Sequence, residues 1–139
     1  MNTYESKQKQ LFVSQTDAYN KLSDLKNIEL YISVAKQQYQ DKIKDISVDS
    51  DSIYFNVENI NVVLRIIDRE VPKTIKFTVE NIPVSANMWI QLKEISDVET
   101  RMKLTIKADI PFFLKPMIGD KLEKGIDEIA NAIALAINK

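Results

Sequence analysis

The last part of the chain carries an apolar stripe that strongly limits how the protein can fold. Large aliphatic residues recur there every three or four positions: Leu114, Ile118, Leu122, Ile126, Ile129, Ile133 and Ile137. This spacing is typical of one face of an α-helix about six turns long. An apolar face of that length must be covered by another layer of secondary structure. The rest of the chain therefore has to supply an apolar surface to cover the helix.

Most of the chain before this helix alternates between apolar and polar residues with a period of two, as strands do. The alternation runs through 51–59, 60–70, 73–81, 87–95 and 100–108, with a weaker strand at about 43–49. The stretch 4–13, "YESKQKQLFV", is extended in pattern but polar on both faces, which is typical of an edge strand or of one beside a wet cavity. Because the connections are short, neighbouring strands should pair antiparallel, and the sheet should curl around the helix.

Helix-start signals follow the first strand. Ser14 and Asp17 have the spacing of a capping box, and Ser23 offers a second start before "DLKNIELYI". We expect two short helices in tandem over about 15–33, with 33–42 as a weaker continuation.

Small residues and a proline mark the C-terminal helix. Ala130 and Ala134 flank the isoleucine stripe, so the helix either approaches the sheet closely there or leaves volume unfilled. Gly125 should cost about 1 kcal/mol relative to alanine, which a close backbone contact or a bend would offset. Pro116 predicts an irregular helix start near 111–116.

Residue types that the chain lacks exclude several classes of function. It has no histidine or cysteine and only two glycines, so familiar serine, cysteine and zinc hydrolases and glycine-rich phosphate loops are excluded. A net charge of −1 argues against nucleic-acid binding. No run of about 18 apolar residues and no signal peptide is present, so we expect a cytoplasmic protein without an integral membrane segment.

Asp49 and Asp51 are the first acidic pair to consider for chemistry. A calcium loop starting at Asp49 would need glycine and glutamate where Tyr54 and Ile60 stand, so we interpret "DSD" as a polar turn. We assign no catalytic residue, metal site or cofactor.

A strand, two short helices, about six antiparallel strands and a long C-terminal helix follow the order of the helix-grip fold. At "YESK", "SDLKNIE" and "IPFFLKPMIGDKLEKGIDEIA", the chain resembles small bacterial proteins of the START-like (SRPBCC) superfamily, which includes steroid and lipid carriers, plant hormone receptors and polyketide cyclases. The resemblance covers essentially all of residues 1–139, as one domain. It implies an α+β fold in which a curved antiparallel sheet of about six or seven strands wraps around the C-terminal helix. It also implies a hydrophobic cavity between sheet and helix, but no single activity.

The strand and helix patterns identify the residues that would line such a cavity. They are Phe55, Leu64, Ile66, Phe77, Ile90, Leu92, Leu104 and Ile106 from the sheet, with Leu122, Ile126, Ile129 and Ile133 from the helix. The first hypothesis is noncatalytic binding of a small hydrophobic or amphipathic ligand, such as a lipid or an aromatic metabolite. The alternative is that the same side chains fill one another's space as an ordinary core.

Two further hypotheses remain open. In a cyclase- or hydratase-type enzyme, carboxylates, Tyr54, Tyr31 and Arg65 would supply acid, base and charge, although the parity of Arg65 favours a solvated outer face. In an interaction module, Trp89 on the outer face would contact a partner or a second copy of the chain, or would be half covered by long neighbouring side chains.

The pair Phe112 and Phe113 has its own alternatives. These aromatic residues could close a cavity mouth, contact a membrane or pack at the start of the helix.

Overall fold

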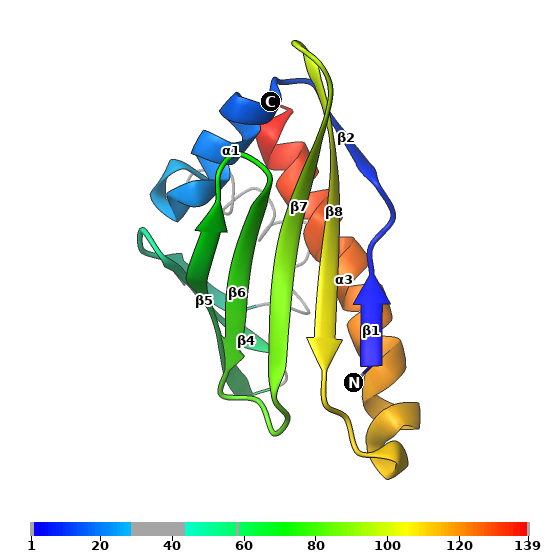
Figure 1. The fold of residues 1–139 in the computed structure, drawn as a ribbon. Coiled ribbons are helices and arrows are strands. Elements are labelled where there is room, and N and C mark those ends of the chain that lie inside the picture. Colours follow the sequence, from blue (N-terminus) through cyan, green and yellow to red (C-terminus); the bar gives the residue numbers. More distant parts are fainter. Residues whose placement is uncertain (1, 29–43, 58, 139) are drawn as a thin grey trace.

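The computed structural model describes residues 2–28, 44–57 and 59–138, which form an antiparallel sheet with a long C-terminal helix on one side (Figure 1). The strands are β1 Asn2–Glu5, β2 Lys9–Leu11, β3 Lys44–Val48, β4 Ser52–Val57, β5 Ile60–Glu70, β6 Thr74–Glu80, β7 Ala86–Ser96 and β8 Glu99–Ala108. The helices are α1 Gln15–Ser23, the short 3-10 helices η1 Leu25–Ile28 and η2 Phe112–Leu114, and α3 Lys115–Ile137. The α+β helix-grip fold expected from the sequence is confirmed.

The sheet is open and its order is β1-β8-β7-β6-β5-β4-β3, with β2 also paired to β8. Strands β3 to β8 therefore follow one another as hairpins, and the N-terminal strands add to the far edge. The sheet has eight strands rather than six or seven because the predicted first strand is interrupted. Its two pieces, β1 and β2, both pair antiparallel with β8.

Ser6 maintains the pairing where this edge strand is interrupted. Its backbone N–H donates to the carbonyl of Leu104, and its buried hydroxyl oxygen accepts from the Leu104 N–H, both at 2.9 Å. The serine side chain thus satisfies a β8 amide that a regular strand would have satisfied through its carbonyl. This role accounts for a buried polar residue in the sequence of the first strand.

The helix-start signals near the N-terminus are confirmed in part. Ser14 caps α1 by accepting a hydrogen bond from the Asp17 N–H, as the capping box predicts. The second start at Ser23 is wrong, because Ser23 is the last residue of α1. The Asp24 carboxylate instead accepts from the Lys26 N–H, and the turn that follows is 3-10 rather than α-helical. Residues 29–33 of the predicted helical segment, and its continuation over 33–42, lie outside the described residues.

Helix α3 begins irregularly, as Pro116 predicted, with η2 immediately before it. It runs along one face of the sheet and packs chiefly on β8, β1 and β2 (Figure 1). Helix α1 covers the same sheet over parts of β6, β7 and β8.

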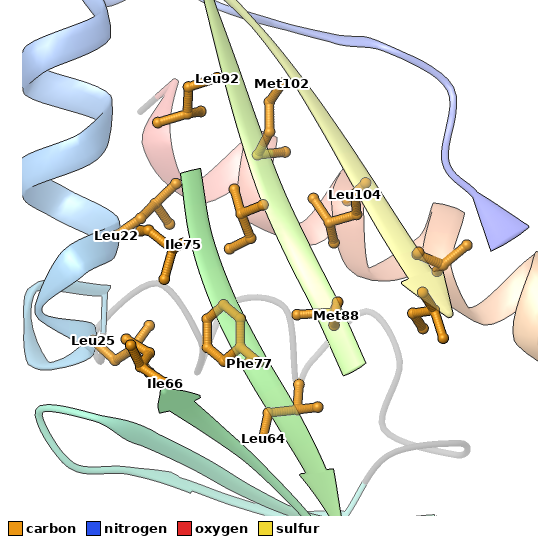
Figure 2. Close-up of a cluster of buried hydrophobic side chains, with 14 of the residues drawn as sticks. Leu22, Leu25, Leu64, Ile66, Ile75, Phe77, Met88, Leu92, Met102 and Leu104 are labelled. Atoms are coloured by element: carbon orange, nitrogen blue, oxygen red, sulfur yellow. The ribbon is translucent and has the colours of Figure 1, made fainter. Parts of the chain in front are cut away.

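One hydrophobic core lies on the face of the sheet that carries α1 and α3. Side chains from β5 to β8 project from this face toward Leu22 and Leu25, which come from α1 and η1 (Figure 2). Phe77, Met88 and Met102 are among the largest fully buried side chains. The core therefore lies between the middle strands of the sheet and the helices that cover this face.

Candidate functional site

The sheet side of the candidate site consists of alternate residues that share one face. The strand register places Ile66 opposite Phe77, Ile90 opposite Leu104 and Leu92 opposite Met102. All of the predicted sheet and helix residues belong to one hydrophobic cluster, either as buried members or packed against it. The cluster is Phe55, Leu64, Ile66, Phe77, Ile90, Leu92, Leu104, Ile106, Leu122, Ile126, Ile129 and Ile133, with further residues around them.

On the helix side of the site, four residues of α3 are buried, namely Ile126, Ala130, Ala136 and Ile137. Ile126, Ala130 and Ile137 are almost completely buried, with exposed fractions of 1%, 0% and 2%. Leu122 and Ile129 lie roughly 40° and 60° around the helix axis from Ile126, as 3.6 residues per turn require. These two side chains are only partly buried.

Partial burial is shared by the rest of the predicted stripe. Leu114, Ile118 and Ile133 also keep part of their surface exposed. The expectation that the whole stripe is covered is therefore wrong, because five of its seven residues are only partly buried.

Apolar side chains on the sheet side are partly exposed as well. Ile53 and Phe55 of β4, and Val79 of β6, are packed against the core without being fully buried. Ile53 and Val79 share the parity of Phe55 and Phe77 but are not among the residues predicted to line the cavity. Partly exposed apolar residues thus occur on both the sheet and the helix.

The other flank of α3 is polar and is fixed to the edge of the sheet. One oxygen of Asp127 accepts the backbone N–H of Lys7 at 3.0 Å and lies 3.0 Å from the ammonium of Lys9. Lys9 pairs with the buried Met102, so its side chain points toward α3 and is only 14% exposed. The Lys7 N–H, followed by Lys9, holds the pKa of the Asp127 carboxyl below its usual range.

Asn138 fixes the end of α3 to the same edge. Its carboxamide donates to the carbonyl of Gln10 and accepts from the N–H of Phe12, at 2.9 and 2.8 Å. The side chain thereby satisfies two backbone groups of β2 and its extension, as a neighbouring strand would. Polar contacts therefore anchor α3 along β2.

The two glycines of α3 differ in the space beside them. A methyl group added at Gly125 would meet no atom of the described residues within 4 Å, so the close contact proposed for this glycine is not made by any of them. A methyl group at Gly119 would lie 3.1 Å from the hydroxyl oxygen of Tyr4. Of the two alanines that flank the stripe, Ala130 is fully buried, whereas Ala134 is only partly buried.

Buried polar side chains in the described residues are hydrogen-bonded, with one exception. Thr100 donates to the carbonyl of Val13, and Thr105 to the side chain of Gln91. The hydroxyl of Tyr19 is buried within the core cluster and has no hydrogen-bond partner in the described part of the chain. Burial raises the pKa of this phenol, so it is a neutral donor at physiological pH.

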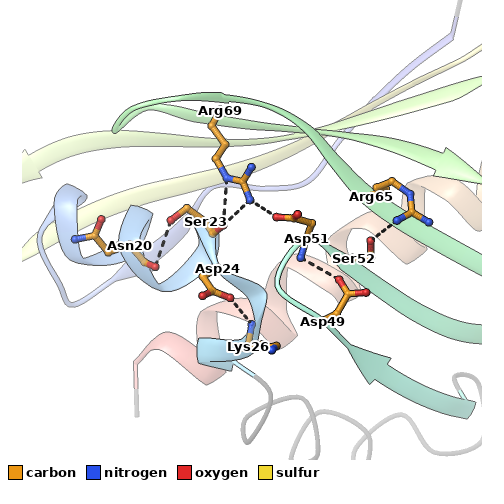
Figure 3. Close-up of polar contacts among 9 residues, drawn as sticks. All are labelled: Asn20, Ser23, Asp24, Lys26, Asp49, Asp51, Ser52, Arg65 and Arg69. Carbon is orange, nitrogen blue, oxygen red and sulfur yellow. Dashed lines mark hydrogen bonds and ion pairs between the residues drawn. The ribbon is translucent and has the colours of Figure 1, made fainter.

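The residues considered for catalysis lie away from the interior. Arg65 projects from the outer face, where its guanidinium pairs with Glu80 and donates to the Ser52 hydroxyl (Figure 3). The Tyr54 hydroxyl donates to Asp49 at 2.9 Å. Neither Tyr54 nor Arg65 points toward α3, because both alternate with inward-facing residues, and Tyr31 lies outside the described residues.

The polar turn predicted at Asp49 and Asp51 connects β3 to β4, and its carboxylates have structural partners. Asp49 accepts the Asp51 N–H, which, with the Tyr54 hydroxyl, lowers the pKa of the Asp49 carboxyl. Asp51 forms an ion pair with Arg69 at 2.6 Å, and the same guanidinium donates to the carbonyl of Ser23 at the end of α1 (Figure 3). Among the described residues, no group of three acidic side chains is arranged to hold a metal ion.

Trp89 lies on the outer face, partly covered by its neighbours as predicted. The ammonium groups of Lys76 and Lys107 lie 5.3 and 5.6 Å from the centroids of its ring system. Both distances are within the range of cation–π attraction. The indole of Trp89 therefore already has cationic partners on the outer face of the sheet.

No protein-family model and no curated protein sequence matches the chain. Known structures, in contrast, share its arrangement of sheet and helices. A START superfamily protein from Mycobacterium smegmatis superposes with a TM-score of 0.59 and 14% identity, over 97% of this chain and 96% of that one. The chain has the START-like fold.

Two further structures share the START-like fold with the chain. A norcoclaurine synthase point mutant from Thalictrum, in complex with a transition-state analogue, has a TM-score of 0.65 and 11% identity, over 98% and 93% of the two chains. The Aha1 dimer from Colwellia psychrerythraea has a TM-score of 0.62 and 16% identity, over 100% and 99%. Identities this low establish the fold alone.

No helix in the described residues is long and apolar enough to cross a bilayer. The cytoplasmic location and the absence of a cofactor stay predictions, as does the role of the twelve residues in lining a cavity.

Proposed function

We propose that the protein binds a small, uncharged, hydrophobic or amphipathic molecule, such as a lipid or an aromatic metabolite, between α3 and the sheet. The supporting observation is the incomplete burial of the apolar arc on α3. Leu122, Ile129 and Ile133 face the core yet keep exposed surface, and so do Ile53 and Phe55 on β4. A folded protein gains free energy by covering such surface, and a bound apolar molecule would cover it.

The way α3 is anchored supports the same proposal. Asp127 and Asn138 tie one flank of the helix to the edge strand, and Ile126 and Ala130 bury its central line. The opposite flank is apolar and carries Gly125, beside which an added methyl group would meet no atom of the described part of the chain within 4 Å. A helix held from one side can leave its other side available to a guest without losing its position.

The chemistry of the interior indicates an uncharged ligand with limited polarity. The ion pair of Lys9 and Asp127 is already formed on the flank toward β2, so neither charge is left to bind an ionised ligand. The Tyr19 hydroxyl is a buried donor that has no hydrogen-bond partner among the described residues, and an unpaired buried donor costs roughly 1–3 kcal/mol. An acceptor oxygen on the ligand would offset that cost, which favours an amphipathic molecule over a pure hydrocarbon.

The experiment that tests this proposal compares ligand capture by three variants and the wild type. Native mass spectrometry would detect bound molecules after purification and after incubation with a library of fatty acids, sterols and aromatic metabolites. Leu122→Trp places a large ring on the apolar flank of α3 and should abolish capture while the fold is retained. Lys124→Trp adds the same ring on the exposed face of the same helix and should leave capture unchanged.

Tyr19→Phe is the third variant, and it tests the polar contact. It should weaken binding of oxygen-bearing ligands roughly tenfold, which corresponds to one hydrogen bond of about 1.4 kcal/mol. If the wild type captures no compound, or if Leu122→Trp and Lys124→Trp behave alike, the interior is an ordinary core and the proposal is wrong.

A further inference from the structure

Three exposed apolar side chains lie close together in the sequence, in η2 and in the first turn of α3. Phe112 is 84% exposed, and Phe113 and Met117 are each 67% exposed. The two phenylalanine rings pack edge to face, with their centroids 5.9 Å apart. We call these three residues the aromatic tip. Exposed apolar side chains gathered in this way mark a surface that contacts another phase or another molecule.

The aromatic tip lies at one end of the molecule and is held there by neighbouring elements. Figure 1 shows the β8–α3 connection at the opposite end of α3 from the C-terminus. The Asp109 N–H donates to the carbonyl of Ser85, so the β6–β7 turn lies alongside this connection. That turn contributes Ile82 and Val84, which are partly buried. The tip is thus the protruding part of a broader apolar end.

The size of the tip decides which occupant fits it. An aromatic side chain can bury roughly 150–250 Å², so the three side chains together offer on the order of 400 Å². A stable protein–protein interface needs about 800 Å² from each partner. The tip is therefore too small to hold a second copy of the chain or a folded partner by itself. A lipid surface needs no matching shape and accepts protruding aromatic side chains at the level of its headgroups.

We propose that the aromatic tip inserts into the interfacial layer of a lipid bilayer and docks the protein there. Charges around the tip are mixed, with Lys107, Lys115 and Lys121 near Asp109 and Asp120 in the sequence, so apolar contact dominates the attachment. Docking should therefore occur on neutral lipid and should change little with salt. This proposal does not depend on ligand binding in the interior.

The test is flotation of the full chain with vesicles of neutral phosphatidylcholine. The variant Phe112→Ser/Phe113→Ser removes both rings from exposed positions and should retain the fold, as checked by circular dichroism. We expect at least a tenfold loss of vesicle binding, because even one of the two rings contributes at least a factor of ten to the binding constant when it enters an apolar phase.

The matched control is Phe12→Ser. Phe12 is 63% exposed but lies at the other end of α3, where its N–H bonds to Asn138. A 23-residue helix is roughly 35 Å long, so Phe12 cannot reach the same bilayer together with the tip. The control variant should bind vesicles as the wild type does.

Three results would overturn the proposal. In the first, the wild type does not float with neutral vesicles. In the second, the tip variant and the Phe12 variant bind equally. In the third, binding appears only on anionic vesicles and disappears when salt is added. That result would point to electrostatic binding through a different surface, a groove of about 550 Å³ on the outer face. Its lining includes Lys73, Lys93, Arg101 and Lys103. Sedimentation velocity on the same variants reports whether the tip causes self-association instead.

Discussion

The contact between Asp127 and the edge strand allows a quantitative prediction. Asp127→Asn keeps the shape of the side chain and retains an oxygen that can accept the Lys7 N–H. It removes the negative charge, so the largely buried ammonium of Lys9 loses its partner.

The expected loss of stability lies between two limits. Exposed ion pairs contribute less than about 1 kcal/mol, whereas hydrogen bonds to charged groups contribute about 1.5–3 kcal/mol. The Asp127 side chain is 32% exposed and that of Lys9 is 14% exposed, so the pair is intermediate. We expect the free energy of unfolding to fall by about 1.5 kcal/mol at pH 7, with a decrease in Tm of roughly 5 °C for a domain of this size.

The pH dependence of this loss follows from the lowered pKa of Asp127. A carboxyl whose folded pKa lies below its unfolded value of 3.8 stabilises the protein fully at neutral pH. The stabilisation is lost as the pH falls from the unfolded value through the folded pKa, because the wild-type carboxyl then becomes neutral in both states. The difference between wild type and Asp127→Asn should therefore shrink as the pH falls below about 4 and disappear once the pH is below the folded pKa.

Urea unfolding of both proteins at several pH values measures this difference directly. Asp120→Asn is the matched control, because Asp120 is exposed on the same helix. It should change the free energy of unfolding by less than about 0.5 kcal/mol. Equal stability of wild type and Asp127→Asn at pH 7, or a loss that is the same at pH 7 and pH 3, would refute the reasoning.

Two further predictions concern stability and can be measured by the same urea method. Gly125→Ala should stabilise the protein by about 1 kcal/mol, because alanine favours helix and its methyl group would meet no atom within 4 Å in residues 2–28, 44–57 and 59–138. Gly119→Ala should gain less or lose stability, since its methyl group would lie 3.1 Å from the Tyr4 hydroxyl; equal effects at both glycines would contradict this contrast. Arg69→Lys should cost about 1–2 kcal/mol, because an ammonium cannot reproduce the guanidinium contacts with the end of α1 and the β3–β4 turn. Wild-type stability of Arg69→Lys would show that charge alone suffices at this position.

The local pattern of the sequence predicted which strand residues face inward, because the side chains of a strand alternate strictly. Phe77 and Leu104 illustrate this, since each is fully buried at the parity expected for it. The helix start at Ser14 was also predictable, because the hydrogen bond from the Asp17 N–H to the Ser14 side chain spans only three residues. Interactions within a few residues of the chain are therefore well represented in the sequence.

Long-range partners were not predictable from local pattern. The stretch 4–13 is polar on both faces, and the partner of its Lys9 lies 118 positions away in Asp127. The partner of the Ser6 hydroxyl is the Leu104 N–H, which is 98 positions away. The apolar spacing of α3 indicated a face to be covered, but not how wide a strip the sheet covers.

The polar edge and the wide apolar arc of α3 together explain how the helix is held. A helix that packed only through its apolar face would settle where that face is most completely covered, over the middle of the sheet. The contacts of Asp127 and Asn138 with β2 instead hold α3 over the edge formed by β1, β2 and β8. Leu122 and Ile129 then remain only partly covered, although they belong to the same apolar arc. Asp127 and Asn138 on one flank of α3 thus determine how much apolar surface stays exposed on the opposite flank. We propose that this exposed apolar surface binds the ligand.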